Sequence, residues 1–133
     1  MAESFLVEIL TPGGEVAHEM ATSVHIPSLR GELEILPSHE DIVGLLGSGV
    51  VKISSGGQDS TYAVSKGAFK VENGNLVLFA EFGIAKEKIN LAEVEKGITE
   101  IEEGLKIIGS EWEVGYQVSK DKLDRFKAMK AAV

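Results

Sequence analysis

Hydrophobic residues in the first two thirds of the chain recur at every second position. The clearest example is FKVENGNLVLFAE, residues 69–81, in which two alternating runs flank Asn73-Gly74. Alternation of this kind is typical of strands, and Asn-Gly supplies the positive φ angles that a type I′ hairpin turn requires. Short runs separated by turn residues predict an antiparallel β-sandwich or barrel from Ser4 to about Ala85.

The period of the hydrophobic pattern changes to three and four after Ile89. One seam of a predicted helix is formed by Val94, Ile98, Ile101, Leu105 and Ile108. Asn90 is a candidate N-cap for this helix, and Glu93 is its candidate partner in a capping box. Gly97 and Gly104 lie seven residues apart beside the seam, which favours close approach of another backbone. The alternative is two tolerated surface glycines.

The segment GSEWEVGYQVS, residues 109–119, interrupts the helical pattern, and a second helix is predicted from about Ser119. Its predicted inward residues are Leu123 and Phe126, with either Met129 or the stem of Lys130 as the next. Two helices joined by a short break predict an antiparallel hairpin. The sequence therefore predicts a two-domain α+β protein, with an N-terminal antiparallel β-sandwich over residues 1–86 and a C-terminal α-helical hairpin over residues 87–133.

Composition narrows the possible classes of protein. The 133 residues include no cysteine, which excludes disulfides, thiolate nucleophiles and cysteine-based zinc sites. The formal net charge of -8 argues against general nucleic-acid binding, which depends on a basic surface. The first residues, MAESFLVEIL, lack the basic and apolar regions of a secretion signal, and no apolar run reaches the roughly 20 residues of a membrane-spanning helix. A soluble intracellular chain is expected.

Charge is distributed unevenly between the two predicted helices. Residues 93–113 carry seven glutamates against two lysines, whereas residues 118–133 carry five basic residues against two aspartates. The five basic residues are Lys120, Lys122, Arg125, Lys127 and Lys130. One interpretation is a folded hairpin whose oppositely charged faces attract each other. The other is a basic arm that leaves its acidic neighbour for an acidic partner.

The sequence contains no recognisable pattern of catalytic residues. The histidines His18, His25 and His39 show no metal-site spacing such as HExxH or HxH, and no serine lies in a GxSxG elbow. Residues 44–54, GLLGSGVVKIS, lack the Lys-Ser pair of a phosphate-binding loop. The acidic residues that follow His39 would point to opposite faces of an extended chain, which argues against a metal or catalytic role there. We expect neither an active site of its own nor a metal.

Two segments resemble the epsilon subunit of F-type ATP synthases. GELEILPSH, residues 31–39, resembles the family signature G-E-L-x-I-x-P-x-H, and residues 63–81 resemble the family's strand-turn-strand piece. The resemblance implies a non-catalytic subunit of the central stalk. Its β-sandwich would bind the gamma subunit and rest on the membrane-embedded c-ring. Its helices would fold against the sandwich, or extend into the catalytic head of alpha and beta subunits and inhibit ATP hydrolysis.

The same resemblance implies roles for individual residues. By position in the signature, Glu32 and His39 would meet the polar loops of the c-ring, with an ordinary solvated turn as the alternative. The basic residues of the second helix would contact acidic stretches of the catalytic head. The apolar residues expected to support the bend as a protein contact are Ile42, Val43, Leu45 and Leu46. The implied location is peripheral, through the complex, on the cytoplasmic face of a bacterial plasma membrane, with the chloroplast thylakoid membrane as the alternative.

The start of the hairpin argues against ATP binding and against any cofactor. Family members that bind ATP there begin the hairpin with I-D or L-D followed by x-x-R-A, where this chain has INLAEV from Ile89. Asn90 replaces the aspartate, and the carboxylate of Glu93 would repel a phosphate. Arg125 and Lys127 are the alternative sources of positive charge. A free-standing β-sandwich binding module is the alternative to a rotor subunit, because sandwich folds host many functions.

Overall fold

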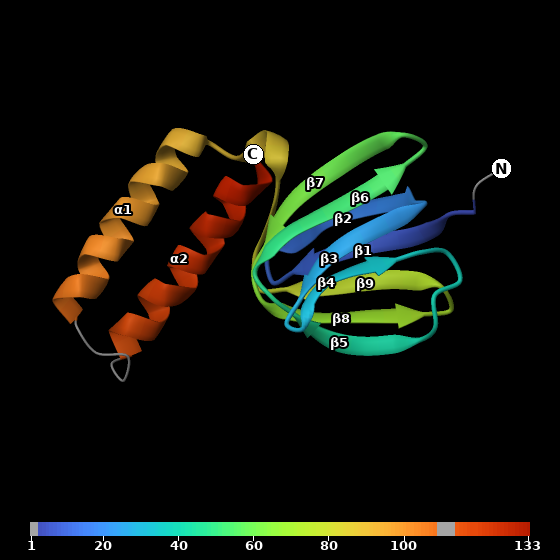
Figure 1. Ribbon diagram of the computed structural model, residues 1–133, viewed down its shortest axis with the longest axis horizontal. Coiled ribbons are helices and arrows are strands. Elements are labelled where there is room, and N and C mark those ends of the chain that lie inside the picture. The colour runs from blue at the N-terminus through green and yellow to red at the C-terminus, as the bar shows by residue number, and fades with distance from the viewer. Residues whose placement is uncertain (1–2, 109–113) are drawn as a thin grey trace.

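A β-sandwich followed by two antiparallel helices makes up the protein, as the predicted fold class required (Figure 1). The computed structural model describes residues 3–108 and 114–133. For residues 107, 108 and 114–116 it describes the backbone only. α2 lies between α1 and the sandwich, so the hairpin is folded against the sandwich through its second helix (Figure 1). No helix in the described part of the chain combines the length and the hydropathy needed to cross a membrane.

The sandwich is built from short strands. They are β1 (Phe5–Thr11), β2 (Gly14–Ala21), β3 (Ser23–Ser28), β4 (Gly31–Ile35), β5 (Ile42–Leu46), β6 (Gly49–Ser55), β7 (Gln58–Val64), β8 (Gly67–Glu72), β9 (Asn75–Ala80) and β10 (Gly83–Ala85). A short 3-10 helix, η1 (Lys86–Lys88), leads to α1 (Leu91–Ile108), and α2 (Val114–Ala132) ends the chain.

The strands follow the order β10-β7-β6-β3-β5-β8-β9-β1-β2, with β4 paired to β3 away from this path. Among the described strands the pairing is antiparallel except between β1 and β9, which run parallel. Parallel neighbours cannot be joined by a tight turn, so this pair brings together the two ends of the sandwich sequence. The alternating hydrophobic pattern did not predict this parallel pairing.

Two glycine-containing turns join neighbouring strands, and the first lies where the sequence predicted it. Asn73 and Gly74 have φ angles of 53° and 81°, as the predicted type I′ turn between β8 and β9 requires. Gly56 and Gly57 have φ angles of 57° and 85° in the turn between β6 and β7. Both hairpins therefore fix their register locally, since a two-residue turn leaves the flanking strands only one pairing.

One hydrophobic cluster fills the sandwich. Its completely covered side chains include Ile9, Val24, Ile26, Ile35, Ile53, Leu76 and Leu78. At its margin the Tyr62 hydroxyl on β7 donates a hydrogen bond of 2.9 Å to the Glu19 carboxylate on β2. This bond spans 43 residues of sequence and links two strands that are not neighbours in the sheet order. Burial and the bond to Glu19 raise the pKa of Tyr62 to about 12.

α1 packs against α2, but the two glycines beside its predicted seam differ in their surroundings. A Cβ atom at Gly97 would lie 2.8 Å from the ring of Phe126, so the absence of a side chain lets that ring approach. The close neighbour is thus a side chain and not the backbone that the spacing suggested. A Cβ atom at Gly104 would have no described atom within 4 Å, so the predicted close approach is wrong there.

The second helix begins at Val114, five residues before the predicted start at Ser119. The sequence from Val114 to Val118 is rich in β-branched, aromatic and glycine residues, which individually disfavour helix. Helix growth is cooperative, however, so a helix anchored further along extends into such residues at little cost. A hydrogen bond of 3.3 Å from the Gln117 amide to Asp121 supports this first part of the helix.

Candidate interaction surfaces

The outer face of β5, β8 and β9 carries large apolar side chains that the core does not use. Val43 is 73% exposed, Leu45 61% and Phe79 49%. Leu45 lies opposite Ala68 on β8, and Ala68 lies opposite Phe79 on β9. Phe79 is in turn aligned with Leu10 of β1. Cross-strand neighbours of this kind touch one another, so Leu45, Ala68, Phe79 and Leu10 form a continuous series. Val43 lies opposite Lys70 and adjoins the series through Leu45, two residues along β5. We call these five side chains the outer apolar row.

The sequences of β1 and β9 carry a signal for this outer surface that the alternating pattern alone does not reveal. In β1 (FLVEILT) and β9 (NLVLFA) nearly every position is apolar, although only alternate side chains enter the core. Strands that read in this way are typical of sheets covered on both faces. Contiguous exposed apolar surface of this kind marks a site of protein contact. The outer face therefore fits a partner that supplies its second covering layer.

The structure places Glu32 and His39 in different settings. Glu32 is exposed on β4, opposite Pro27 of β3. His39 lies half-buried in the bend after β4, where its backbone N–H donates to the Leu36 carbonyl at 3.2 Å. Its ring Nδ1 lies 2.7 Å from the Glu40 carbonyl oxygen. In the described part of the chain no hydrogen bond or ion pair joins Glu32 to His39, and most of β4 lies between them in the chain.

The apolar run after this bend forms strand β5, so its residues alternate between the two faces. Val43 and Leu45 face outward, whereas Leu46 is 1% exposed and belongs to the core. Ile42 also packs against the core, so the expectation that all four apolar residues support an interface at the bend is wrong for Ile42 and Leu46. The bend also contacts the β8–β9 turn: the Asp41 carboxylate accepts a hydrogen bond of 3.0 Å from the Asn73 backbone N–H.

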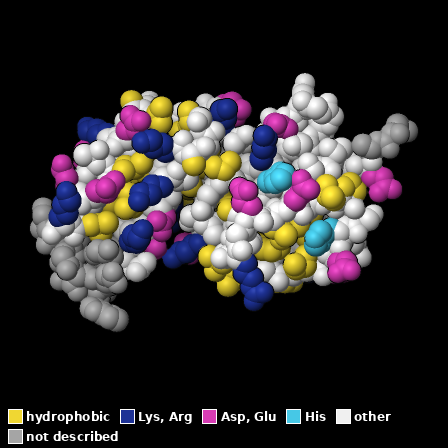
Figure 2. Space-filling model, viewed as in Figure 1, with side chains coloured by type: hydrophobic (Ala, Val, Ile, Leu, Met, Phe, Trp, Pro, Cys, Tyr) yellow, Lys and Arg dark blue, Asp and Glu magenta, His cyan; other side chains and the backbone are white. Residues whose placement is uncertain are grey.

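Basic side chains gather over the helices, with acidic ones among them (Figure 2). Lys120 pairs with Asp124 along α2 at 3.3 Å, and Lys130 reaches Glu95 of α1 at 3.9 Å. This last pair joins the two oppositely charged helices, as the folded-hairpin interpretation required. Such exposed pairs contribute about 0–1 kcal/mol each.

Arg125, Lys122 and Lys127 complete the basic set. The Arg125 guanidinium lies 3.9 Å from Glu81 of the sandwich and 5.6 Å from the centre of the Phe82 ring. Lys122 and Lys127 make no ion pair with any described residue. Among the described residues, three of the five basic side chains thus form ion pairs within the chain and two do not.

The residues at the start of the hairpin have structural roles. The Asn90 side chain accepts a hydrogen bond of 3.2 Å from the Glu93 backbone, so the predicted N-cap is confirmed. Ile89 packs against a small apolar cluster between the sandwich and α2. A groove of about 510 Å³ between the helices is lined by Lys122 and Arg125, but by none of Ile89, Asn90 and Glu93. The structure therefore does not bring these residues together with Arg125 in that groove.

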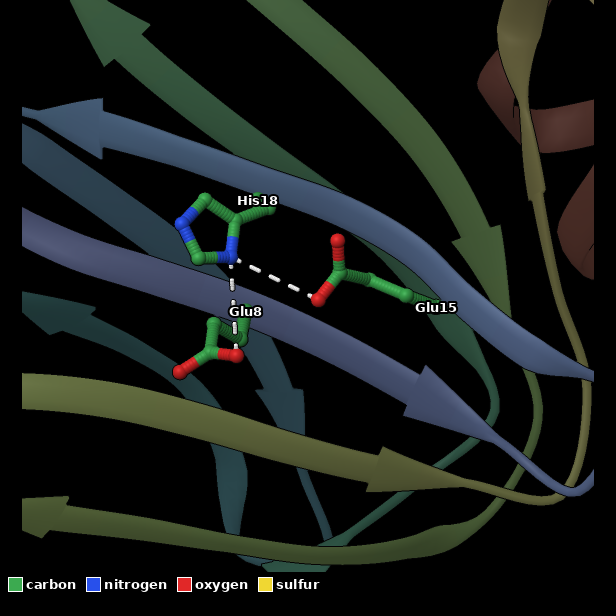
Figure 3. A group of neighbouring side chains, drawn as sticks. All are labelled: Glu8, Glu15 and His18. Carbon is green, nitrogen blue, oxygen red and sulfur yellow. Dashed lines mark ion pairs between the residues drawn. The ribbon is translucent and has the colours of Figure 1, made fainter.

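A group of three polar side chains lies on β1 and β2, where linear spacing had shown no metal motif (Figure 3). His18 Nδ1 is 3.6 Å from the Glu8 carboxylate and 3.4 Å from that of Glu15. The side chains are 53%, 26% and 49% exposed respectively. Imidazole and carboxylate are suitable ligands for a divalent ion, and the same contacts are equally those of a surface ion pair when His18 is protonated.

Comparisons with known proteins agree with this architecture. Residues 4–86 match the family described as "ATP synthase, Delta/Epsilon chain, beta-sandwich domain". The chain is 32% identical over 114 residues to the ATP synthase epsilon chain of Desulforamulus reducens, which covers 86% of each protein. It is 33% identical over 90 residues to that of Desulforudis audaxviator, a match that covers 68% of this chain and 66% of the relative.

Solved structures share the fold. One is a chain in the structure described as "Cryo-EM structure of Euglena gracilis mitochondrial ATP synthase, OSCP/F1/c-ring in rotational state 1", with a TM-score of 0.81 and 20% identity. The match covers 97% of this chain and 81% of that chain. A second, from the central stalk and c-ring of the Tetrahymena thermophila mitochondrial ATP synthase, has a TM-score of 0.59 and 13% identity.

Proposed function

The chain belongs to the ATP synthase delta/epsilon family, and on this premise we propose that it is a non-catalytic rotor subunit of the central stalk. It would link the gamma subunit to the c-ring and regulate ATP hydrolysis through its helices. The observation that carries the proposal is the outer apolar row, because apolar surface of this extent fits a lasting protein contact. Residues 1–86 would form the rotor-binding part and residues 87–133 the regulatory part.

We assign the gamma subunit to the outer apolar row. Val43, Leu45 and Phe79 would be buried there, and burial of such side chains contributes about 25 cal/mol per Å² of apolar surface. The c-ring would meet the polar end of the sandwich through Glu32 and His39. These two groups then act as separate contacts, because β4 lies between them. The chain would be peripheral to a bacterial plasma membrane, on the cytoplasmic face, and held there by the complex.

The regulatory part of the proposal rests on the modest attachment of α2 to the sandwich. The fully buried residues of that contact are small, namely Ala63, Ala128 and Ala132, and the larger apolar residues packed around them are only partly buried. These larger residues are Val50, Ile84, Ile89 and Met129. Partly exposed ion pairs form the rest, among them Lys66 with Asp121 at 3.2 Å. Contacts of this kind permit two states of the hairpin within a few kcal/mol of each other. In the extended state the basic side chains of α2 would meet acidic stretches of the catalytic head.

Gamma binding tests the central claim. In the full chain, Val43→Glu with Phe79→Glu would place two charges in the outer apolar row, and we expect gamma affinity to fall at least about tenfold. Leu91→Glu is the matched control, because Leu91 is an exposed apolar residue of α1. Titration with purified gamma gives the affinities. Unchanged binding by a folded double variant refutes the assignment of gamma to the outer apolar row. A sizing column tests the alternative function: an unaltered chain that elutes separately from gamma favours the free-standing module.

The c-ring contact is tested separately. Glu32→Lys should weaken the coupling of proton flow to ATP synthesis in membrane vesicles, while Glu34→Lys, two residues along the same strand, should weaken it less. Equal coupling in both variants and in the unaltered complex would mean that this strand end is solvated surface.

Charge reversal on α2 tests the regulatory claim. Lys122 and Lys127 make no ion pair with described residues, so Lys122→Glu with Lys127→Glu should raise ATP hydrolysis toward that of a chain ending at Glu87. Arg125→Glu with Lys130→Glu is the comparison, because it also breaks the contacts to Glu81 and Glu95 that hold the hairpin folded. If the first pair leaves hydrolysis unchanged, these lysines have no inhibitory contact.

A further inference from the structure

A small polar cavity lies in the seam between the sandwich and α2. Its lining comes from the loops before β6 and β8, from the residue after β9 and from α2, and consists of Ser48, Ser65, Lys66, Glu81, Asp121, Asp124 and Arg125. Its volume is about 10 Å³. A space of this size holds about one water molecule and excludes larger ligands.

Two buried polar atoms belong to residues that line this cavity, and neither has a hydrogen-bond partner among the described residues. They are the Ser65 hydroxyl oxygen and the Arg125 Nε. Ser65 is 3% exposed, so its hydroxyl has no access to bulk solvent. Arg125 is partly exposed, but its Nε atom is covered while the far end of its guanidinium reaches Glu81. Buried donors without partners cost about 1–3 kcal/mol each, so two at one cavity point to a shared ligand.

We propose that one water molecule is bound in this cavity and bridges Ser65 to Arg125. The water accepts a hydrogen bond from Arg125 Nε–H and exchanges one with the Ser65 hydroxyl. It can donate to a carboxylate of the lining, of which Asp124 is on the same helix as Arg125. This gives the water the two to four polar partners that buried waters have.

The charges around the cavity favour a neutral ligand. Glu81, Asp121 and Asp124 supply three carboxylates, and Lys66 and Arg125 supply two cations. A chloride ion would face the three carboxylates, and a metal cation would face the Arg125 Nε–H donor. Water alone can accept from the guanidinium and donate to a carboxylate at the same time.

This site is a property of the folded chain and does not depend on the proposed regulation. It makes the seam a hydrated contact, since the water lies among the ion pairs of Lys66 with Asp121 and of Arg125 with Glu81. Polar groups in such a seam exchange one water partner for others when the helix leaves. The cost of separating α2 from the sandwich is therefore lower than for a dry apolar contact of equal area.

The arginine Nε–H resonance of the full chain provides the test, because the sequence contains two arginines, Arg125 and Arg30. Arg30 is exposed and serves as the internal control. We expect a rotating-frame Overhauser peak from Arg125 Nε–H to water with the sign of a dipolar contact, and exchange with solvent at least about tenfold slower than at Arg30. A peak of the exchange type alone, or no peak, overturns the proposal.

A substitution then locates the water. Ser65→Val fills the cavity with methyl groups and should abolish the water peak at Arg125, whereas Ser60→Val on β7 should retain it. Persistence of the peak in folded Ser65→Val shows that the water lies elsewhere and overturns the proposal. If Ser65→Val does not fold, a high-resolution crystal structure of the unaltered chain decides. Density for a water within hydrogen-bond distance of both Ser65 Oγ and Arg125 Nε supports the site, and its absence overturns it.

Discussion

The sandwich and the helical hairpin bury their side chains to very different degrees. The sandwich has one continuous cluster whose central residues, such as Ile53 and Leu78, are completely covered. In the helices the buried side chains among those described are Val94, Leu123, Ala128 and Ala132. Two of these four are alanines, which contribute little apolar surface. The sandwich is therefore stabilised by its own core, while the helices depend on their neighbours.

The contacts between the sandwich and α2 also bury less surface than the core of the sandwich does. α2 meets the sandwich through buried alanines, through larger apolar side chains that are only partly buried, such as Met129 and Ile84, and through partly exposed ion pairs, such as Lys66 with Asp121. Exposed ion pairs are individually weak, and small side chains bury little area. The contact between the two regions is therefore less deeply buried than the core of the sandwich.

The largest predicted difference lies between matched core substitutions. Leu78→Ala removes a fully covered side chain of the sandwich and should lower the free energy of unfolding by about 2–5 kcal/mol. Leu123→Ala, in α2, should destabilise the helices and leave the sandwich transition within about 0.5 kcal/mol of the unaltered chain. Denaturant unfolding followed by amide hydrogen exchange separates the two regions. Equal loss of sandwich stability in both variants would mean that the chain unfolds as one unit.

High pH should act on the sandwich through Tyr62. Its pKa is 10.0 in the unfolded chain and about 12 in the folded one, so the folded state retains the proton more strongly. The stabilisation is fully present below pH 10 and is lost as the pH rises through 12. We expect a loss of about 1–3 kcal/mol over this window.

Tyr62→Phe is the control for this pH effect. It should lower stability at neutral pH by about 1–2 kcal/mol, because the Glu19 carboxylate loses its donor. It should also flatten the dependence of unfolding free energy on pH above pH 10. A variant with the same alkaline slope as the unaltered chain would assign that slope to other groups.

The smallest predicted effect lies within the hairpin, between its two glycines. Gly104→Ala should raise the stability of the helices by about 1 kcal/mol, because alanine favours helix and its Cβ meets no described atom. Gly97→Ala should lower it by about 1 kcal/mol, because its Cβ would displace the Phe126 ring. Thermal unfolding monitored by helical circular dichroism measures both. Equal gains from both substitutions would show that the Phe126 ring adapts freely.

The interaction surfaces were predicted less completely than the fold. The motif residues Glu32 and His39 could be picked out from the sequence, but their separation by β4 could not. The outer apolar row was missed because the two faces of β9 look alike in sequence, and the pairing of strands decides which face is inside. The partners of Arg125 lie 43 and 44 residues earlier, at Phe82 and Glu81, beyond the range of any local pattern.

The sequence by itself determined the features that depend on neighbouring residues. Alternation defined most strands, Asn73-Gly74 defined a turn, and Asn90 defined a helix start. Only the tertiary structure decided the parallel pairing of β1 with β9, the unequal surroundings of Gly97 and Gly104, and the polar cavity beside Ser65. The physical reason is range: turns and caps involve a few adjacent residues, whereas pairing and packing depend on which distant segments the whole fold brings together.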